Sequence, residues 1–114
     1  NVVRAAMGVE NGGYLTNPSG EQTKIETVIK AAIEQGFYVI VDWHDHNAQN
    51  QIDQAIIFFS YIAKIYGKYK NLIYEPYNEP QNVDWPTVKS CHEKVVAAIR
   101  QYDKYNLIVL GTTT

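Results

Sequence analysis

Apolar positions along the chain fall into four short runs separated by three longer segments with a helical period. The runs are rich in β-branched and aromatic residues and are short enough to be strands. They cover Val2–Met7, Phe37–Trp43, Leu72–Tyr77 and Leu107–Leu110. Their first residues are spaced evenly along the chain, yet no sequence repeat accompanies the spacing. The pattern therefore predicts a repeated architectural unit of one strand followed by one helix.

Between the runs, apolar residues recur every three to four positions, as they do on one face of a helix. These faces comprise Ile25, Val28, Ile29, Ala32 and Ile33, then Ile52, Ala55, Ile56, Phe59, Ile62, Ala63 and Tyr66, then Val88, Val95, Ile99 and Tyr102. Ser19 with Gln22 predicts a capping box at the start of the first helix, and Gly36 predicts its end. Asp84 is expected to cap the third helix, with Pro86 in its first turn.

Alternating strands and helices predict a parallel sheet with right-handed crossovers. Two α/β architectures fit this order, a (β/α)8 TIM barrel and an open doubly wound sheet. A barrel of about 250 residues has roughly 31 residues in each strand–helix unit, which is close to the spacing of the runs. No Gly-rich phosphate loop follows any run, which weighs against a nucleotide-binding sheet. Four strands cannot close a barrel, so we expect about half of one.

Composition and charge narrow the possible classes of protein. Apolar residues make up 46% of the chain and charged residues 19%, values typical of a globular domain and unlike a disordered chain. The formal net charge is −2 and the basic residues are scattered, so no nucleic-acid partner is expected. No run approaches the roughly 18 apolar residues that a membrane span requires. The single cysteine, Cys91, is expected to be a buried small apolar residue.

The two ends of the sequence bear on domain organisation. The chain opens within one apolar run and stops at Gly111–Thr114, just after another. Domains rarely begin and end at strands without flanking loops, so we expect residues 1–114 to be an internal fragment of a single larger domain. On that expectation, the lack of a targeting segment says nothing about localisation.

Polar residues follow the predicted strands at the edge where parallel α/β proteins bind ligands. The third strand leads into Asn78-Glu79-Pro80. Pro80 favours an extended conformation at Glu79, which would present this carboxyl group at the end of the strand beside aromatic residues. A partly desolvated carboxyl group stays protonated to higher pH, as a general acid must. Asn78 could bind a substrate hydroxyl, whereas the simpler alternative is a turn with a solvated carboxylate.

The end of the second strand carries two histidines. His44 could contact substrate or orient a carboxylate, and it could equally be a hydrogen-bonded loop histidine. Together with His46 and Asp45 it could instead bind a metal ion.

Arg4 lies within an otherwise apolar strand, where a buried guanidinium needs a carboxylate partner. The two-residue period of a strand places Asp42 and His44 on one face, and it predicts a second shared face for Glu75, Tyr77 and Glu79. Arg4 could therefore pair with Asp42, with Glu75, or with a carboxylate outside this chain.

Five separated motifs occur along essentially the whole chain: Val3–Met7, Gly12–Tyr14, Val41–His44, Ile73–Glu75 with Asn78–Pro80, and Leu107–Thr112. In order and spacing they resemble glycoside hydrolase family 5, especially its bacterial-type endo-β-1,4-glucanases (cellulases) of the second subfamily. Two positions depart from the family pattern. Pro76 stands where a β-branched apolar residue is usual, and Gly8 replaces an aromatic residue seen in some relatives.

The resemblance implies a (β/α)8 barrel that hydrolyses β-1,4-glucosidic bonds in cellulose or related β-glucans with retention and without a metal or cofactor. The chain would hold strands two to five of that barrel. Glu79 matches the family's acid/base and Asn78 the residue that contacts the sugar's 2-hydroxyl. His44 matches a histidine that lines the cleft. Arg4 matches the arginine that supports the nucleophile.

The same resemblance places the nucleophilic Glu on the seventh strand, outside this chain, so the chain alone is expected to be inactive. It also implies a polysaccharide substrate, secretion to the extracellular space, and no membrane or obligate protein partner. Two other functions fit the residues. One is a non-catalytic sugar-binding fragment that uses Trp43, Tyr77, Tyr14 and Trp85 for stacking. The other is a metal-dependent hydrolase that uses His44 and His46.

Overall fold

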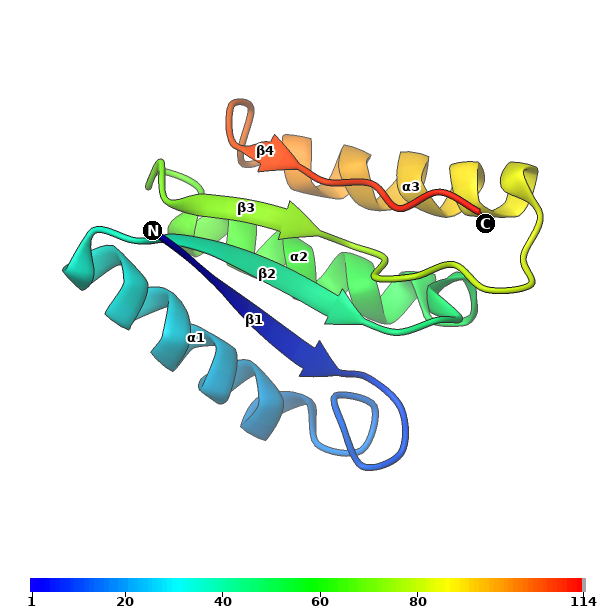
Figure 1. Cartoon of the computed structure of the whole chain (residues 1–114), viewed down its shortest axis with the longest axis horizontal. Helices are drawn as coiled ribbons and strands as arrows, with labels where there is room; N and C mark the ends of the chain where they lie inside the picture. The colour runs from blue at the N-terminus through cyan, green and yellow to red at the C-terminus, as the bar shows by residue number, and fades with distance from the viewer. Residues whose placement is uncertain (114) are drawn as a thin grey trace.

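The computed structural model describes residues 1–113 of the chain. Helices and strands alternate as predicted: β1 (Val2–Gly8), α1 (Pro18–Gln35), β2 (Tyr38–His44), the short 3-10 turn η1 (Ala48–Asn50), α2 (Ile52–Tyr66), β3 (Leu72–Glu75), α3 (Trp85–Arg100) and β4 (Leu107–Ile108) (Figure 1). Within the described residues, no helix is both long and apolar enough to cross a membrane. Of the predicted segment Gly111–Thr114, the last residue lies outside the described part.

The four strands form one parallel sheet in the sequential order β1-β2-β3-β4. A doubly wound sheet reverses its strand order at a switch point, and no such reversal occurs along these four strands. Residues Val39, Val41 and Trp43 of β2 are buried, whereas Tyr38 and His44 on its other face are exposed. Figure 1 shows α2 passing behind β2 and β3. The sheet is thus covered on one face, as the wall of a (β/α)8 barrel is.

The core lies between the covered face of the sheet and the three helices. Trp43 is fully buried at its centre, with its ring 5.0 Å from that of Tyr14, 5.7 Å from Phe58 and 6.2 Å from Phe59. Aromatic rings at these separations pack with favourable tilted geometry in addition to their buried area. The aromatic cluster therefore anchors β2 against α2 immediately before the strand delivers His44.

The residues that cap the helices were predicted only in part from the sequence. The capping box predicted from Ser19 and Gln22 is wrong: the Asn17 side chain caps α1 by accepting from the Gly20 amide at 3.1 Å, and Pro18 takes the first helical position. Proline suits that position because its missing N–H has no helical partner there. The predictions at the other two ends are confirmed. Gly36 ends α1 at φ 72° and Asp84 caps α3.

The third strand is shorter than predicted because Pro76 cannot donate to the sheet. This strand ends at Glu75 instead of Tyr77. The fourth strand, β4, is also shorter than predicted and ends at Ile108 instead of Leu110. The alternation of side chains breaks at the same place. Tyr77 is fully buried, whereas Glu79 is exposed, so the predicted shared face of Glu75, Tyr77 and Glu79 is wrong.

Candidate active site

A cluster of polar side chains lies on the uncovered face of the sheet, toward the carboxyl ends of the strands. Strand register brings the cluster together: Asp42 on β2 lies opposite Ala6 on β1 and Glu75 on β3. Arg4, two residues before Ala6 on the same face of β1, reaches across to both carboxylates. Residues far apart in the sequence therefore converge because parallel strands end at the same edge.

Arg4 is the centre of this cluster. Its Nε and Nη2 donate to the two oxygens of Glu75, each at 2.9 Å, and Nη2 also lies 3.1 Å from Asp42 Oδ2. Such a fork of two parallel bonds fixes the guanidinium plane as well as its position. The hydrogen bond to Glu75 raises the pKa of Arg4 above its ordinary value. The predicted pairs with Asp42 and Glu75 are both confirmed, and all of these bonds use Nε and Nη2.

Asp42 is the most deeply buried charged group of the cluster, with no exposed surface. Its Oδ2 accepts from His44 Nδ1 at 2.8 Å, which confirms that the two residues share a face of β2. Burial raises the pKa of Asp42, the Glu75 carboxylate adds to the increase, and the contacts with His44 and Arg4 oppose it. The His44 side chain itself is 43% exposed and is accessible to a ligand.

Asn78 is oriented by the same arginine. Its Oδ1 accepts from Arg4 Nη2 at 2.5 Å. With the amide oxygen used in this way, the amide N–H donors remain for a ligand oxygen. The expected role of Asn78, binding a sugar hydroxyl, stays a prediction.

Glu79 follows directly and is held through its backbone. His46 Nδ1 donates to the Glu79 carbonyl at 3.1 Å and lies 3.8 Å from its carboxylate Oε2. The Glu79 side chain is 65% exposed, so residues 1–113 do not supply the aromatic surroundings that the sequence predicted for it. The carboxylate still lies near enough to Arg4 to contribute to the raised pKa of the guanidinium, after the larger effects of Glu75 and Asp42. It is therefore at the cluster and open toward solvent.

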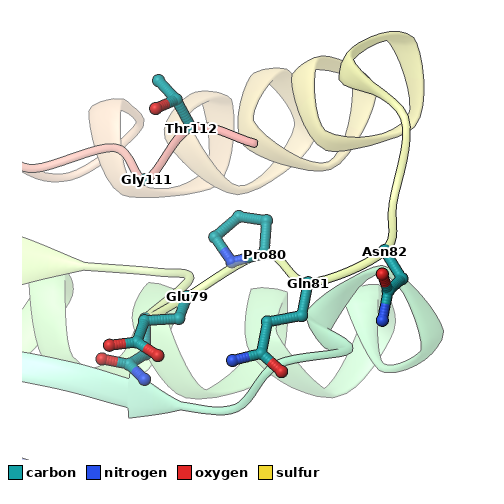
Figure 2. A pocket seen from close by; sticks show the side chains of 7 residues that line it. Glu79, Pro80, Gln81, Asn82, Gly111 and Thr112 are labelled. Atoms are coloured by element: carbon teal, nitrogen blue, oxygen red, sulfur yellow. The ribbon is translucent and has the colours of Figure 1, made fainter. Parts of the chain in front are cut away.

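A hollow of about 550 Å³ lies beside this segment, lined by Asn78, Glu79, Pro80, Gln81, Asn82, Gly111 and Thr112. Figure 2 shows the side chains of Glu79 and Gln81 pointing to the same side, away from the segment that carries Gly111 and Thr112. The ring of Pro80 turns toward that segment, and a Cβ on Gly111 would lie only 3.0 Å from Pro80 Cδ. Gly111 thus allows the chain after β4 to pack closely against Pro80.

Two supporting contacts were not identified from the sequence: those of His92, which was not singled out, and those of Tyr77, which was expected to stack on sugar. His92 Nε2 donates to the Gly111 carbonyl at 2.7 Å, and its ring lies 6.0 Å from that of Tyr77. Tyr77 donates in turn to the His46 carbonyl at 3.1 Å and to Gln49, and burial raises the pKa of its phenol to about 12. The available signal was a histidine on the apolar face of the third helix. Together Tyr77 and His92 hold the loops on either side of Glu79.

The aromatic residues assigned to sugar stacking are mostly in the core, which contradicts that prediction. Trp43 and Tyr77 have no exposed surface and Tyr14 is 5% exposed, whereas Trp85 at the start of α3 is 46% exposed. Three of the four cannot reach a sugar because their neighbours on the covered face enclose them.

The geometry does not support the metal site proposed from His44 and His46. Their Nδ1 atoms are directed to different partners, Asp42 for His44 and the Glu79 carbonyl for His46. Across residues 1–113, no group of three or more His, Cys, Asp or Glu side chains is arranged to hold a metal ion.

Comparison with known proteins gives relatives along the entire chain. The family described as "Cellulase (glycosyl hydrolase family 5)" matches residues 1–114. Endoglucanase Z of Dickeya dadantii is 50% identical over 98% of this chain, and an endoglucanase of Clostridium saccharobutylicum is 43% identical over all of it. The chain spans 27% of the length of each of these two proteins.

Solved structures agree with this assignment. A structure from Cytophaga hutchinsonii superposes with a TM-score of 0.97 at 50% identity, and the catalytic domain of Thermobifida fusca endoglucanase Cel5A with 0.95 at 37% identity. Each match covers 99% of this chain and 38% of the solved chain. The four strands are accordingly part of a (β/α)8 barrel. By sequence along its full length and by fold, the chain belongs to glycosyl hydrolase family 5.

Proposed function

We propose that residues 1–114 are part of the catalytic domain of a retaining endo-β-1,4-glucanase and that Glu79 is its general acid and base. The observation that carries the proposal is the placement of Glu79 next to Asn78, whose amide is fixed by an arginine held between two carboxylates. A variant of the Thermobifida fusca relative has been solved in complex with cellotetraose, which supports a β-glucan as the substrate class.

Retaining hydrolysis needs two carboxyl groups about 5–5.5 Å apart. In the proposed reaction, Glu79 protonates the leaving glycosidic oxygen while a second carboxylate, outside residues 1–114, attacks the anomeric carbon. The bond from that carbon to the leaving oxygen breaks and a glycosyl–enzyme ester forms. Glu79 then removes a proton from the water that hydrolyses this ester.

The other residues of the cluster prepare the site for this reaction. Asn78 offers its amide N–H groups to a hydroxyl of the sugar that is cleaved, and His44 lines the cleft. Arg4 keeps its Nη1 group available to support the second carboxylate, because Nε and Nη2 make its bonds to Glu75, Asn78 and Asp42. The exposed side of Glu79 would be covered by the substrate and by the remaining part of the barrel.

The full-length enzyme with Glu79→Gln tests the role of this carboxyl group. We expect turnover of unactivated β-glucan to fall about 10²–10⁴-fold, the range that a positioned acid or base contributes. An aryl glycoside with a good leaving group needs no protonation, so formation of its glycosyl–enzyme should persist. Added azide, which needs no base, should then restore turnover by attacking that intermediate.

A matched control is Glu93→Gln on α3, whose side chain is also 65% exposed but, among the described residues, pairs with Lys89 alone. This control should keep normal turnover. If Glu79→Gln hydrolyses cellulose as fast as the wild type, Glu79 is not the acid/base.

The proposal also places the enzyme outside the cell, because a polymeric glucan cannot cross a membrane to reach it. Hydrolysis of polymeric glucan should be found in cell-free culture fluid of the producing organism. Activity confined to washed, lysed cells would contradict secretion.

A further inference from the structure

Asp42 is a buried titratable group to which the proposed reaction gives no role. It lies on the uncovered face of β2, in register with Ala6 and Glu75, yet it has no exposed surface. Burying a carboxylate is costly unless hydrogen bonds and opposite charge compensate. A purely structural strand position would more economically carry an apolar residue, as Ile40 does two residues earlier on the same face.

The contacts of Asp42 are unevenly divided between its two oxygens. Oδ2 accepts from His44 Nδ1 at 2.8 Å and lies 3.1 Å from Arg4 Nη2. Oδ1 is buried without a hydrogen-bond partner among the described residues. The polar contacts of Asp42 are therefore made with the two residues that line the site, Arg4 and His44.

The contact with His44 determines where the imidazole carries its proton. An ionised carboxylate is only an acceptor, so the nitrogen that faces it must carry hydrogen. In the neutral ring the proton is then on Nδ1, and Nε2 presents a lone pair. This is the logic by which partners of a histidine fix its tautomer and ring orientation in other sites. The His44 side chain is 43% exposed, so its ring is accessible to a ligand.

We propose that Asp42 is a positioning residue that fixes His44 as the Nδ1–H tautomer and anchors Arg4 through the same oxygen. His44 Nε2 then serves as a hydrogen-bond acceptor for a hydroxyl group of the substrate chain. The identity of that hydroxyl as part of a sugar rests on the proposed function. The tautomer rests on the geometry of Asp42 alone.

Glu75 provides the comparison that isolates this role. It is the stronger partner of Arg4, with two bonds of 2.9 Å, and within residues 1–113 it has no hydrogen bond or ion pair with His44. Removing the charge of Glu75 weakens the hold on Arg4 and leaves the imidazole partner in place. Removing the charge of Asp42 alters both the contact with Arg4 and the hydrogen bond to the imidazole of His44.

The test uses the full-length enzyme labelled with ¹⁵N-histidine, as wild type, Asp42→Asn and Glu75→Gln. At a pH high enough for the imidazole ring to be neutral, the wild type should show His44 protonated at Nδ1 and bare at Nε2. The amide that replaces the carboxylate in Asp42→Asn can donate as well as accept, so the population of this tautomer should fall. Glu75→Gln should keep the wild-type tautomer. We expect kcat/KM on β-glucan to fall about 10–100-fold in Asp42→Asn, by analogy with the loss of a hydrogen-bond partner of a metal-ligating histidine.

Three results would overturn the proposal. The first is a wild-type His44 protonated at Nε2 instead of Nδ1, a measurement that needs no variant to fold. The second is an Asp42→Asn enzyme with unchanged tautomer and unchanged kcat/KM. The third is the same loss of tautomer in Glu75→Gln, which would assign the effect to Arg4. A wild type with the expected tautomer but no hydrolysis of β-glucan would instead remove the proposed function and the sugar hydroxyl with it.

Discussion

At the scale of single residues, one cation organises the candidate site. Arg4 contacts Glu75, Asp42 and Asn78, so three side chains from two other segments take their positions from it. A lysine could satisfy the charge but not the fork geometry, because its ammonium group is a point charge on a flexible stem. The alignment of Asn78 thus depends on the shape of the guanidinium.

Cys91 gives a prediction at the same scale. It is 1% exposed on α3, and burial raises the pKa of its thiol to about 11. The thiolate is the reactive form, and a thiol with this pKa is protonated at neutral pH. We expect Cys91 in the folded protein to resist a thiol-specific chromogenic reagent at pH 8 and to react fully once unfolded. Rapid labelling under native conditions would contradict its place in the core.

Asp103 provides a pH-dependent contribution to stability. It accepts from the Tyr74 hydroxyl at 2.6 Å and from the backbone amides of Tyr105 and Asn106, each at 3.1 Å. Burial pushes the pKa of Asp103 upward, but these hydrogen bonds outweigh burial and hold it below its ordinary value. The ionised form is therefore favoured by folding.

The sign of the effect follows from that shift. The stability contributed by Asp103 is fully present above the pKa of the unfolded chain, about 4, and is lost as the pH falls through the lower pKa of the folded state. In the full-length protein, the difference in free energy of unfolding between wild type and Asp103→Asn should be constant from pH 5 to 7 and shrink below about pH 4. Urea unfolding at each pH measures it. A difference that grows toward low pH would refute the assignment.

At the scale of elements, the start of α1 distinguishes the sequence expectation from the observed cap. Asn17→Ala should lower the free energy of unfolding by about 1 kcal/mol, because it removes the acceptor for the Gly20 amide. Ser19→Ala, an exposed change two residues later, should stay within about 0.5 kcal/mol. Urea denaturation of both variants of the full-length protein compares them. The reverse order of effects would restore Ser19 as the cap.

Most elements could be predicted because their signals are local. The helical faces, Gly36 and Asp84 act within a few residues, and the strand–helix order then fixes a parallel sheet. The alternation beyond Glu75 could not be predicted by counting, because Pro76 ends the strand and resets the direction of the side chains that follow. The side chain of Tyr77 consequently points into the core, although the carboxylate of Glu75, two residues earlier, lies on the uncovered face.

The candidate site was predictable to a similar degree. The side-chain pairs of Arg4 follow from a charge in an apolar strand and from the convergence of strand ends. The supporting contacts of His46 and His92 with backbone carbonyls do not, because no residue pattern marks a carbonyl that lies on a distant loop. Under the proposed function, the surroundings of Glu79 also depend on segments of the barrel outside residues 1–114.

At the scale of the whole molecule, the uncovered face and the two outer strands determine behaviour in isolation. Val2 is 57% exposed, Tyr38 53% and Leu107 66%, and β1 and β4 are the outer strands of the four. Unpaired strand edges and exposed apolar surface promote association. We expect the 114-residue chain, produced alone, to self-associate in size-exclusion chromatography with light scattering.

A pair of variants distinguishes association through strand edges from nonspecific association through exposed apolar side chains. Leu107→Lys places a charge on the outer strand β4 and should shift the chain toward monomer. Ile57→Lys on α2 alters a residue of nearly equal exposure, 65%, away from the sheet and should change association little. A monomeric wild-type chain with a sharp two-state melt would show that the sheet needs no further strands.

The polar network around Asp103 lies at the end of the sheet opposite to the cluster around Arg4. Asn106 ties the turn before β4 to the carbonyls of Gly67 and Tyr69 before β3, where the strands begin. Stabilising bonds and reactive groups are thus held by different sets of loops. Natural selection can therefore exchange the loops at the carboxyl ends of the strands while the fastening at the other end is inherited unchanged.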